Sequence, residues 1–105
     1  MIYNAEFSVE FNEMVENVKV IAREWRHRCS GAQIESFLKM FCEKLDDMNF
    51  KMEFVDDPEV YVKSNLLDAM DLFMDKILPQ FGQKTMTYRT FNSIYDCMKE
   101  FYFNN

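Results

Sequence analysis

The sequence contains little that would interrupt a helix. Its 105 residues include two glycines and two prolines, against eleven phenylalanines and nine methionines. Glycine and proline are the residues least compatible with a helix interior, so their scarcity favours long helices. With 49% hydrophobic residues the chain is too apolar to stay disordered. Its length suits one core, and we expect residues 1–105 to form a single helical domain.

Long uncharged runs are also missing. The longest stretch without a charged side chain covers only residues 77–83, whereas a membrane-spanning helix needs about 18 or more apolar residues. The N-terminus has neither a basic start nor an apolar run of signal-peptide length. We therefore expect no membrane association and a location in the cytoplasm or nucleus.

Cysteine and histidine are too few for the common metal and disulfide frameworks. Cys29, Cys42 and Cys97 are odd in number and widely spaced, which argues against disulfides and against paired zinc ligands. The only histidine, His27, excludes a di-iron helical bundle, which requires several. Cys29 lies in a basic setting, but side chains two residues apart on a helix diverge by about 200°, so His27 is poorly placed to act as its base. The sequence predicts no enzyme activity, no metal and no cofactor.

The charge balance is acidic, with a formal net charge of −6. Because nucleic-acid binding depends on lysine and arginine neutralising phosphates, this balance disfavours nucleic acid as a partner. Two acidic ridges stand out, one at Glu6, Glu10 and Glu13, the other at Asp68, Asp71 and Asp75. Both ridges fit a solvated helix face, and they also fit a surface that docks a basic partner.

The first half of the chain predicts two helices. Residues 5–29 place apolar side chains every three or four positions, with acidic residues early and basic ones late, as the helix dipole favours. Ser30-Gly31 then predicts a tight turn, with Gly31 in a left-handed conformation and Ser30 with Gln33 as a capping box. The second helix should end near Asp47 or Met48.

Residues 48–55 allow two interpretations. Apolar residues alternate with polar ones from Met48 to Phe54, which is the period of a strand, so a short hairpin at about 49–63 is one alternative. Asp57-Pro58-Glu59 instead indicates a helix start, with aspartate as the N-cap and proline at the first helical position. The helix interpretation is preferred.

The second half of the chain then predicts two more helices, one over residues 58–78 that Pro79 stops, and one that starts at Thr87 as its cap. The fold class is therefore all-α, either a four-helix bundle or an orthogonal four-helix packing.

Function rests on a surplus of soft apolar side chains. The third helix carries more apolar residues than one face can bury. Near the end of the chain, three aromatic residues follow one another, Phe101, Tyr102 and Phe103. Such surfaces suit an interaction module that binds an amphipathic segment of a partner protein or a second copy of itself. The alternative is a small acidic inhibitor that competes for a basic site on its target. The expected partner-binding residues are Met70, Phe73, Met74, Ile77, Phe81, Phe101 and Phe103.

Overall fold

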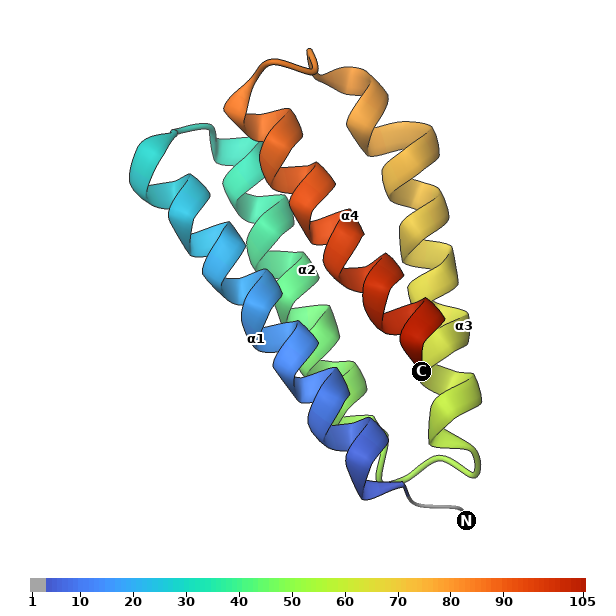
Figure 1. Cartoon of the computed structure of the whole chain (residues 1–105). Helices are drawn as coiled ribbons and strands as arrows, with labels where there is room; N and C mark the ends of the chain where they lie inside the picture. Colours follow the sequence, from blue (N-terminus) through green and yellow to red (C-terminus); the bar gives the residue numbers. More distant parts are fainter. Residues whose placement is uncertain (1–3) are drawn as a thin grey trace.

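The computed structural model describes residues 4–105, and in this range it forms an all-α helical bundle without strands. Helix α1 covers Ala5–Arg28, α2 covers Ala32–Lys51, α3 covers Pro58–Leu72 and α4 covers Met86–Asn104. Helix α3 continues into a π-helical turn, η1 (Phe73–Ile77), and a 3-10 turn, η2 (Leu78–Gln80). Successive helices run in opposite directions along the bundle (Figure 1). The all-α prediction is confirmed.

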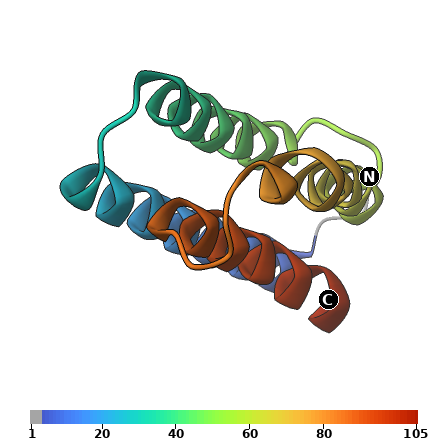
Figure 2. The same ribbon diagram turned by 90° about the horizontal axis from the view of Figure 1, so that it is seen from above.

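The helices pack in an unequal ring. Helix α1 packs against both α2 and α4, and α3 packs against α4. Seen from above, α1 and α4 lie side by side, with α2 and α3 on the other side of the bundle (Figure 2). Helix α2 meets the α3 side through large rings, since Phe41 of α2 lies 5.1 Å from Phe73 of η1 between ring centroids. This side of the bundle therefore depends on aromatic side chains to close it.

Phenylalanine and methionine fill the core. Phe11, Phe73 and Met98 are fully buried, and every helix contributes to one continuous apolar cluster. Rings from distant parts of the chain touch, such as Phe7 and Phe101 with centroids 5.2 Å apart. Most of the bulky apolar side chains are thus buried in the core of the bundle.

Three helix starts are capped by side chains. Asn4 accepts a hydrogen bond from the Phe7 N–H, and Asp57 accepts one from Val60 with Pro58 at the first helical position. Thr85 caps α4 by accepting from the Tyr88 N–H at 3.1 Å. The predicted cap at Thr87 is wrong, because the Thr87 hydroxyl accepts a hydrogen bond from the Trp25 indole instead. Each cap satisfies an N–H that the first turn leaves without a helical partner.

The turn between α1 and α2 differs from its prediction. Gly31 is the N-cap of α2 with φ at 167°, an extended conformation, and this end of the helix has no side-chain cap. Neither the left-handed glycine nor the Ser30–Gln33 capping box is formed. Cys29, also extended, ends α1 instead, so the chain leaves the helix one residue before the Ser30-Gly31 pair.

The predicted hairpin alternative at 49–63 is also wrong. Helix α2 continues through Lys51, beyond the predicted end, and α3 begins at Pro58. Met48 and Met52 are one helical turn apart and both are buried, while Phe50 and Phe54 are exposed. The strand-like alternation arises because two pairs of apolar residues, each spaced by four, lie on opposite faces of the same segment.

The end of the third helix is irregular in a way that Pro79 explains. Proline has no N–H and crowds the carbonyl four residues earlier, which disfavours a regular α-helix. The Leu78 N–H reaches back five residues to the Phe73 carbonyl, as in a π-turn, and the chain then tightens into η2. None of the described helices combines the length and hydrophobicity needed to cross a membrane.

Candidate functional site

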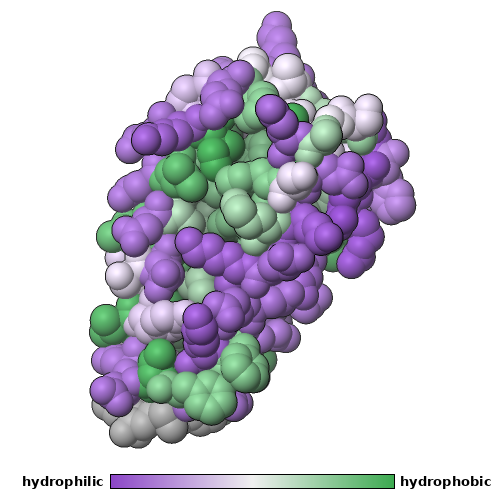
Figure 3. All heavy atoms as spheres, turned by 180° about the vertical axis from the view of Figure 1, so that it is seen from behind, coloured by the Kyte–Doolittle hydropathy of each residue, from purple (hydrophilic) through white to green (hydrophobic). Residues whose placement is uncertain are grey.

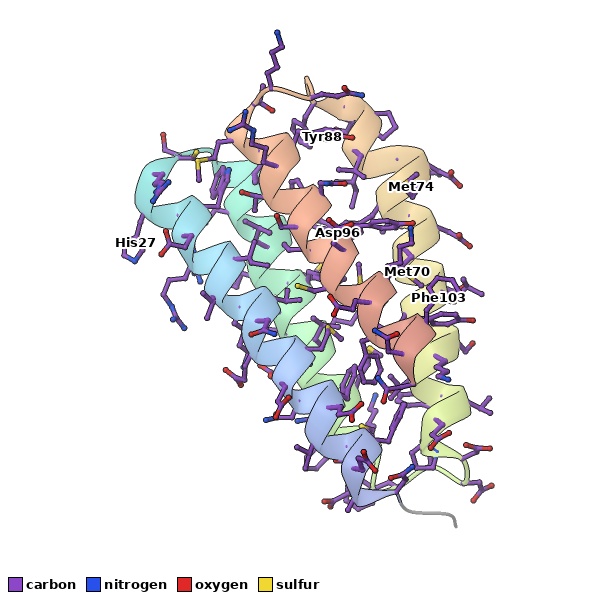
Figure 4. The ribbon with its side chains drawn as sticks, viewed as in Figure 1. His27, Met70, Met74, Tyr88, Asp96 and Phe103 are labelled. Carbon is purple, nitrogen blue, oxygen red and sulfur yellow. The ribbon has the colours of Figure 1, made fainter. Side chains whose placement is uncertain are left out.

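The seven residues expected to bind a partner divide into two groups. Met70, Phe73, Ile77 and Phe101 are at most 8% exposed and belong to the core. Met74 is 50% exposed and Phe103 71% exposed, whereas Phe81 is half-buried. Two of the four core residues reach a surface hollow: Ile77, and Phe101, which borders a hollow between α1 and α4 that is also lined by Glu10, Glu13 and Glu100. Met70 and Phe73 contribute to stability rather than to an accessible surface. Figure 4 shows Met70, Met74 and Phe103 along the α3–α4 side of the bundle.

The expected surplus of apolar residues on the third helix is nevertheless visible outside the core, on α3 and η1. Val60, Leu67, Leu72 and Met74 are 41–63% exposed. Val60, Leu67 and Met74 follow one another at intervals of seven residues, which places them on nearly the same helix face. Single exposed apolar residues are ordinary on a protein surface, so they indicate a binding site only together with a further feature, such as a hollow or an adjoining exposed ring.

An apolar cleft of about 420 Å³ opens between the start of α2 and the η1–η2 segment. Its walls are Ile34 and Phe37 of α2, Ile77 of η1, Phe81 and Phe91, and its rim is Gly31, Ala32, Gln33 and Gln80. The rear face of the molecule shows an apolar hollow in its upper half, bordered by hydrophilic side chains (Figure 3). We call this hollow the apolar cleft.

Stacked rings form one wall of the cleft. Phe81 lies nearly parallel to Phe91, with ring centroids 5.6 Å apart and 14° between the planes. Phe37 meets Phe91 edge to face at 5.7 Å. Rings held by neighbouring rings are restricted in rotation, so the cleft offers a preformed apolar surface.

The π-helical turn shapes the part of the cleft wall that Ile77 and Phe81 form. Ile77 is the last residue of η1, and Phe81 follows directly after η2. A π-turn contains an extra residue, so the side chains that follow it are rotated relative to a regular α-helix, and such turns occur often at functional sites. The irregularity caused by Pro79 thus coincides with the wall of the cleft.

A second hollow lies between the η1–η2 segment and α4. It measures about 580 Å³ and is lined by Met74, Leu78, Tyr88 and Tyr95, together with polar groups such as Asp96. Figure 4 shows Met74, Tyr88 and Asp96 on this side of the bundle. Phe81 lines both hollows, but only the apolar cleft lacks titratable side chains.

Burial disfavours the reactive thiolate at two of the three cysteines. Burial raises the pKa of Cys42, although Arg26 and Lys19 partly oppose the shift. Burial also raises the pKa of Cys97, and the nearby Glu100 and Asp96 add to the increase. Both shifts favour the neutral thiol over the reactive thiolate. Cys29 is half-buried against the core, while His27 is exposed.

We expect Cys42 and Cys97 to react with a thiol reagent more slowly in the folded protein at pH 7.5 than in denaturant. Because their pKa values rise on folding, these groups should contribute stability that is fully present below the ordinary thiol pKa of about 8.5 and lost as pH rises through the folded values. Reaction rates measured in the native protein and in denaturant test the first expectation. Urea unfolding between pH 7.5 and 10 tests the pH dependence of stability, with the C42A/C97A variant as control. Equal pH dependence of the two proteins would contradict it.

Among the described residues, one ion pair joins two helices, and the other ion pairs lie within a single helix. Lys19 of α1 contacts Asp46 of α2 at 2.8 Å, and this hydrogen bond is the chief reason that the pKa of Lys19 is raised. Arg26, His27 and Arg28 occupy the last turn of α1, where the helix dipole favours cations. Within residues 4–105, no group of three or more histidine, cysteine, aspartate or glutamate side chains is arranged to hold a metal ion.

Comparison with known proteins adds no relative. No family model matches the chain, and no curated protein or solved structure matches it either.

Proposed function

We propose that this protein is a non-catalytic interaction module that binds an amphipathic helix in the apolar cleft. The helix comes from a partner protein or from a second copy of the chain. The observation that carries the proposal is a preformed cleft whose walls are Ile34, Phe37, Ile77, Phe81 and Phe91. Grooves of this kind receive the apolar side chains that an amphipathic helix presents at intervals of three and four residues.

The chemistry of the cleft supports binding rather than catalysis. Its lining offers apolar side chains and two amides, Gln33 and Gln80, at the rim. Amides can orient a ligand by hydrogen bonding, but they supply neither a nucleophile nor a general base near neutral pH. The volume of about 420 Å³ falls within the usual range for ligand sites, about 300–1,000 Å³.

The proposed location is the cytoplasm or nucleus. Cys29, Cys42 and Cys97 are all free and half-buried. Free thiols are typical of reducing compartments, where disulfides are rare.

A helical peptide selected from a displayed library provides the test, with Ala32→Glu as the variant. Ala32 is exposed at the rim and begins α2, so glutamate places a charge at the apolar cleft while an acidic residue remains favourable at a helix N-terminus. We expect the dissociation constant of the peptide to rise at least about tenfold, corresponding to about 1.4 kcal/mol. Isothermal titration calorimetry measures it.

Ser36→Glu is the matched control, because Ser36 is exposed on the same helix but does not line the cleft. The proposal requires this control to bind the peptide as the unmodified protein does. If both variants weaken binding equally, or neither does, the apolar cleft is not the binding site.

A further inference from the structure

The end of α2 and the loop after it present a pair of phenylalanine rings to solvent. Phe50 is 68% exposed and Phe54 69% exposed, and their ring centroids lie 5.3 Å apart. An apolar area is visible at the lower end of the rear face, well away from the upper hollow (Figure 3). We call Phe50 and Phe54 the exposed phenylalanine pair.

The fold does not need these two rings. Met48 and Met52 of the same segment are 3% and 2% exposed and fill the core positions there. Phe50 and Phe54 instead stack on each other on the outside, where two large apolar side chains are costly to keep in water. Two adjoining exposed rings therefore point to a surface that another molecule covers.

The segment that carries the pair is rich in carboxylates. The segment from Asp46 to Glu59 contains six carboxylates and one lysine, which accounts for −5 of the formal net charge of −6. The lysine, Lys51, already contacts Asp47 at 3.0 Å. Asp46 also contacts Lys19 of α1 at 2.8 Å. Most of the formal excess negative charge of the protein thus lies in the segment that carries the exposed phenylalanine pair.

We propose that this surface binds a basic amphipathic segment of another protein. Lysine and arginine side chains of that segment meet the carboxylates, and its apolar or guanidinium groups cover the two rings. Cations are attracted to the faces of aromatic rings, and this attraction strengthens when the groups are removed from water. Nucleic acids and anionic lipids would be repelled by the same carboxylates.

The local charge also opposes symmetric pairing with a second copy. Joining the same surface of two molecules would bring two segments of formal charge −5 together, and like charges across an interface are unfavourable. The surface lies at the opposite end of α2 from the apolar cleft, since α2 begins beside the cleft and ends at Lys51 (Figure 1). The two surfaces can therefore be tested separately.

The test uses two synthetic helical peptides with identical apolar faces, one with lysine and arginine on its polar face and one with glutamate there. Calorimetry on the full chain should show the basic peptide binding at least about tenfold more tightly than the acidic one. Its affinity should fall several-fold between about 0.05 M and about 0.5 M salt, because salt screens exposed charges. Equal binding of the two peptides, or affinity independent of salt, would overturn the proposal.

The F50S/F54S double variant tests the rings, with Phe103→Ser as the control. Phe103 is similarly exposed, at 71%, but lies on α4. The double variant should weaken binding of the basic peptide at least about tenfold, while Phe103→Ser and Ala32→Glu change it less than about twofold. Circular dichroism should show unchanged helix content in all of them, since none of these side chains is buried.

Two results would contradict the role of the phenylalanine pair. The first is a double variant that folds and binds the basic peptide normally. The second is a dimer in sedimentation analysis that the double variant dissociates, because the occupant of the surface would then be a second copy. Loss of peptide binding through Ala32→Glu alone would assign the basic segment to the apolar cleft, which also overturns this proposal.

Discussion

Phe73→Ala should lower the free energy of unfolding by about 4 kcal/mol, within the usual range of about 3–5 kcal/mol for truncating a buried phenylalanine. Phe73 is fully buried, and its ring lies 5.1–6.1 Å from the rings of Phe37, Phe41 and Phe91. Removing it leaves a cavity where α2 meets η1 and α4. Because the whole stability of a domain is about 5–15 kcal/mol, the variant should be close to unfolding at 37 °C. Urea denaturation measures the loss.

Met74→Ala is the matched control for this prediction. Met74 is the next residue in the chain, but it is 50% exposed. Its truncation should cost less than about 1 kcal/mol, because exposed positions rarely contribute more. Similar losses for the two variants would contradict the assignment of Phe73 to the core and of Met74 to the surface.

Trp25→Ala should destabilise the protein by a similar amount, about 3–5 kcal/mol. Trp25 is 1% exposed, and its indole N–H donates a hydrogen bond to the Thr87 hydroxyl at 3.1 Å. The side chain therefore ties the end of α1 to the start of α4, two segments that are far apart in the sequence. Since the variant has no tryptophan, its unfolding is followed by circular dichroism.

A double-mutant cycle separates the hydrogen bond from the packing of the indole. Trp25→Phe keeps most of the apolar volume but removes the donor, and Thr87→Val removes the acceptor. The coupling energy between the two changes should be about 1 kcal/mol, the usual net value of one hydrogen bond. A coupling energy near zero would show that the bond contributes nothing and that Trp25 acts through packing alone.

Local sequence signals predicted the helices well. The spacing of Phe7, Phe11 and Val18 identified the buried face of α1, and Asp57-Pro58 located the start of α3 at the correct residue. These signals succeed because helix periodicity and N-caps depend on residues within one or two turns of each other. Thr85 caps α4 by the same mechanism. The sequence prediction placed the cap at Thr87, because this residue, two positions later, carries the same kind of side chain.

The alternation from Met48 to Phe54 could not be resolved from the sequence. Two methionines on the core side and two phenylalanines on the outside give the same order of apolar and polar letters as a strand. Only the position of the core distinguishes the helix from the strand. That position depends on how α2 packs against α1, and the Lys19–Asp46 contact joins these two helices. Because of the same ambiguity, the sequence did not predict that Phe50 and Phe54 are exposed.

The apolar cleft was partly accessible to sequence reasoning. Ile77 and Phe81 were among the expected binding residues and do line it, whereas Ile34, Phe37 and Phe91 were not. Their spacing assigns Ile34, Phe37 and Phe91 to the buried faces of α2 and α4. Nothing in the local sequence shows that the η1–η2 segment leaves part of these faces open to solvent. A cleft between segments so distant in the chain depends on tertiary packing, which one sequence does not encode in any local pattern.

Methyl NMR during titration with the selected helical peptide tests the central claim most directly. The methyl groups of Ile34 and Ile77 line the apolar cleft, while Ile94 is fully buried in the core. The account predicts that the Ile34 and Ile77 signals shift together and saturate with the peptide, while Ile94 stays nearly unchanged. Peptide binding that leaves both Ile34 and Ile77 unperturbed would contradict it.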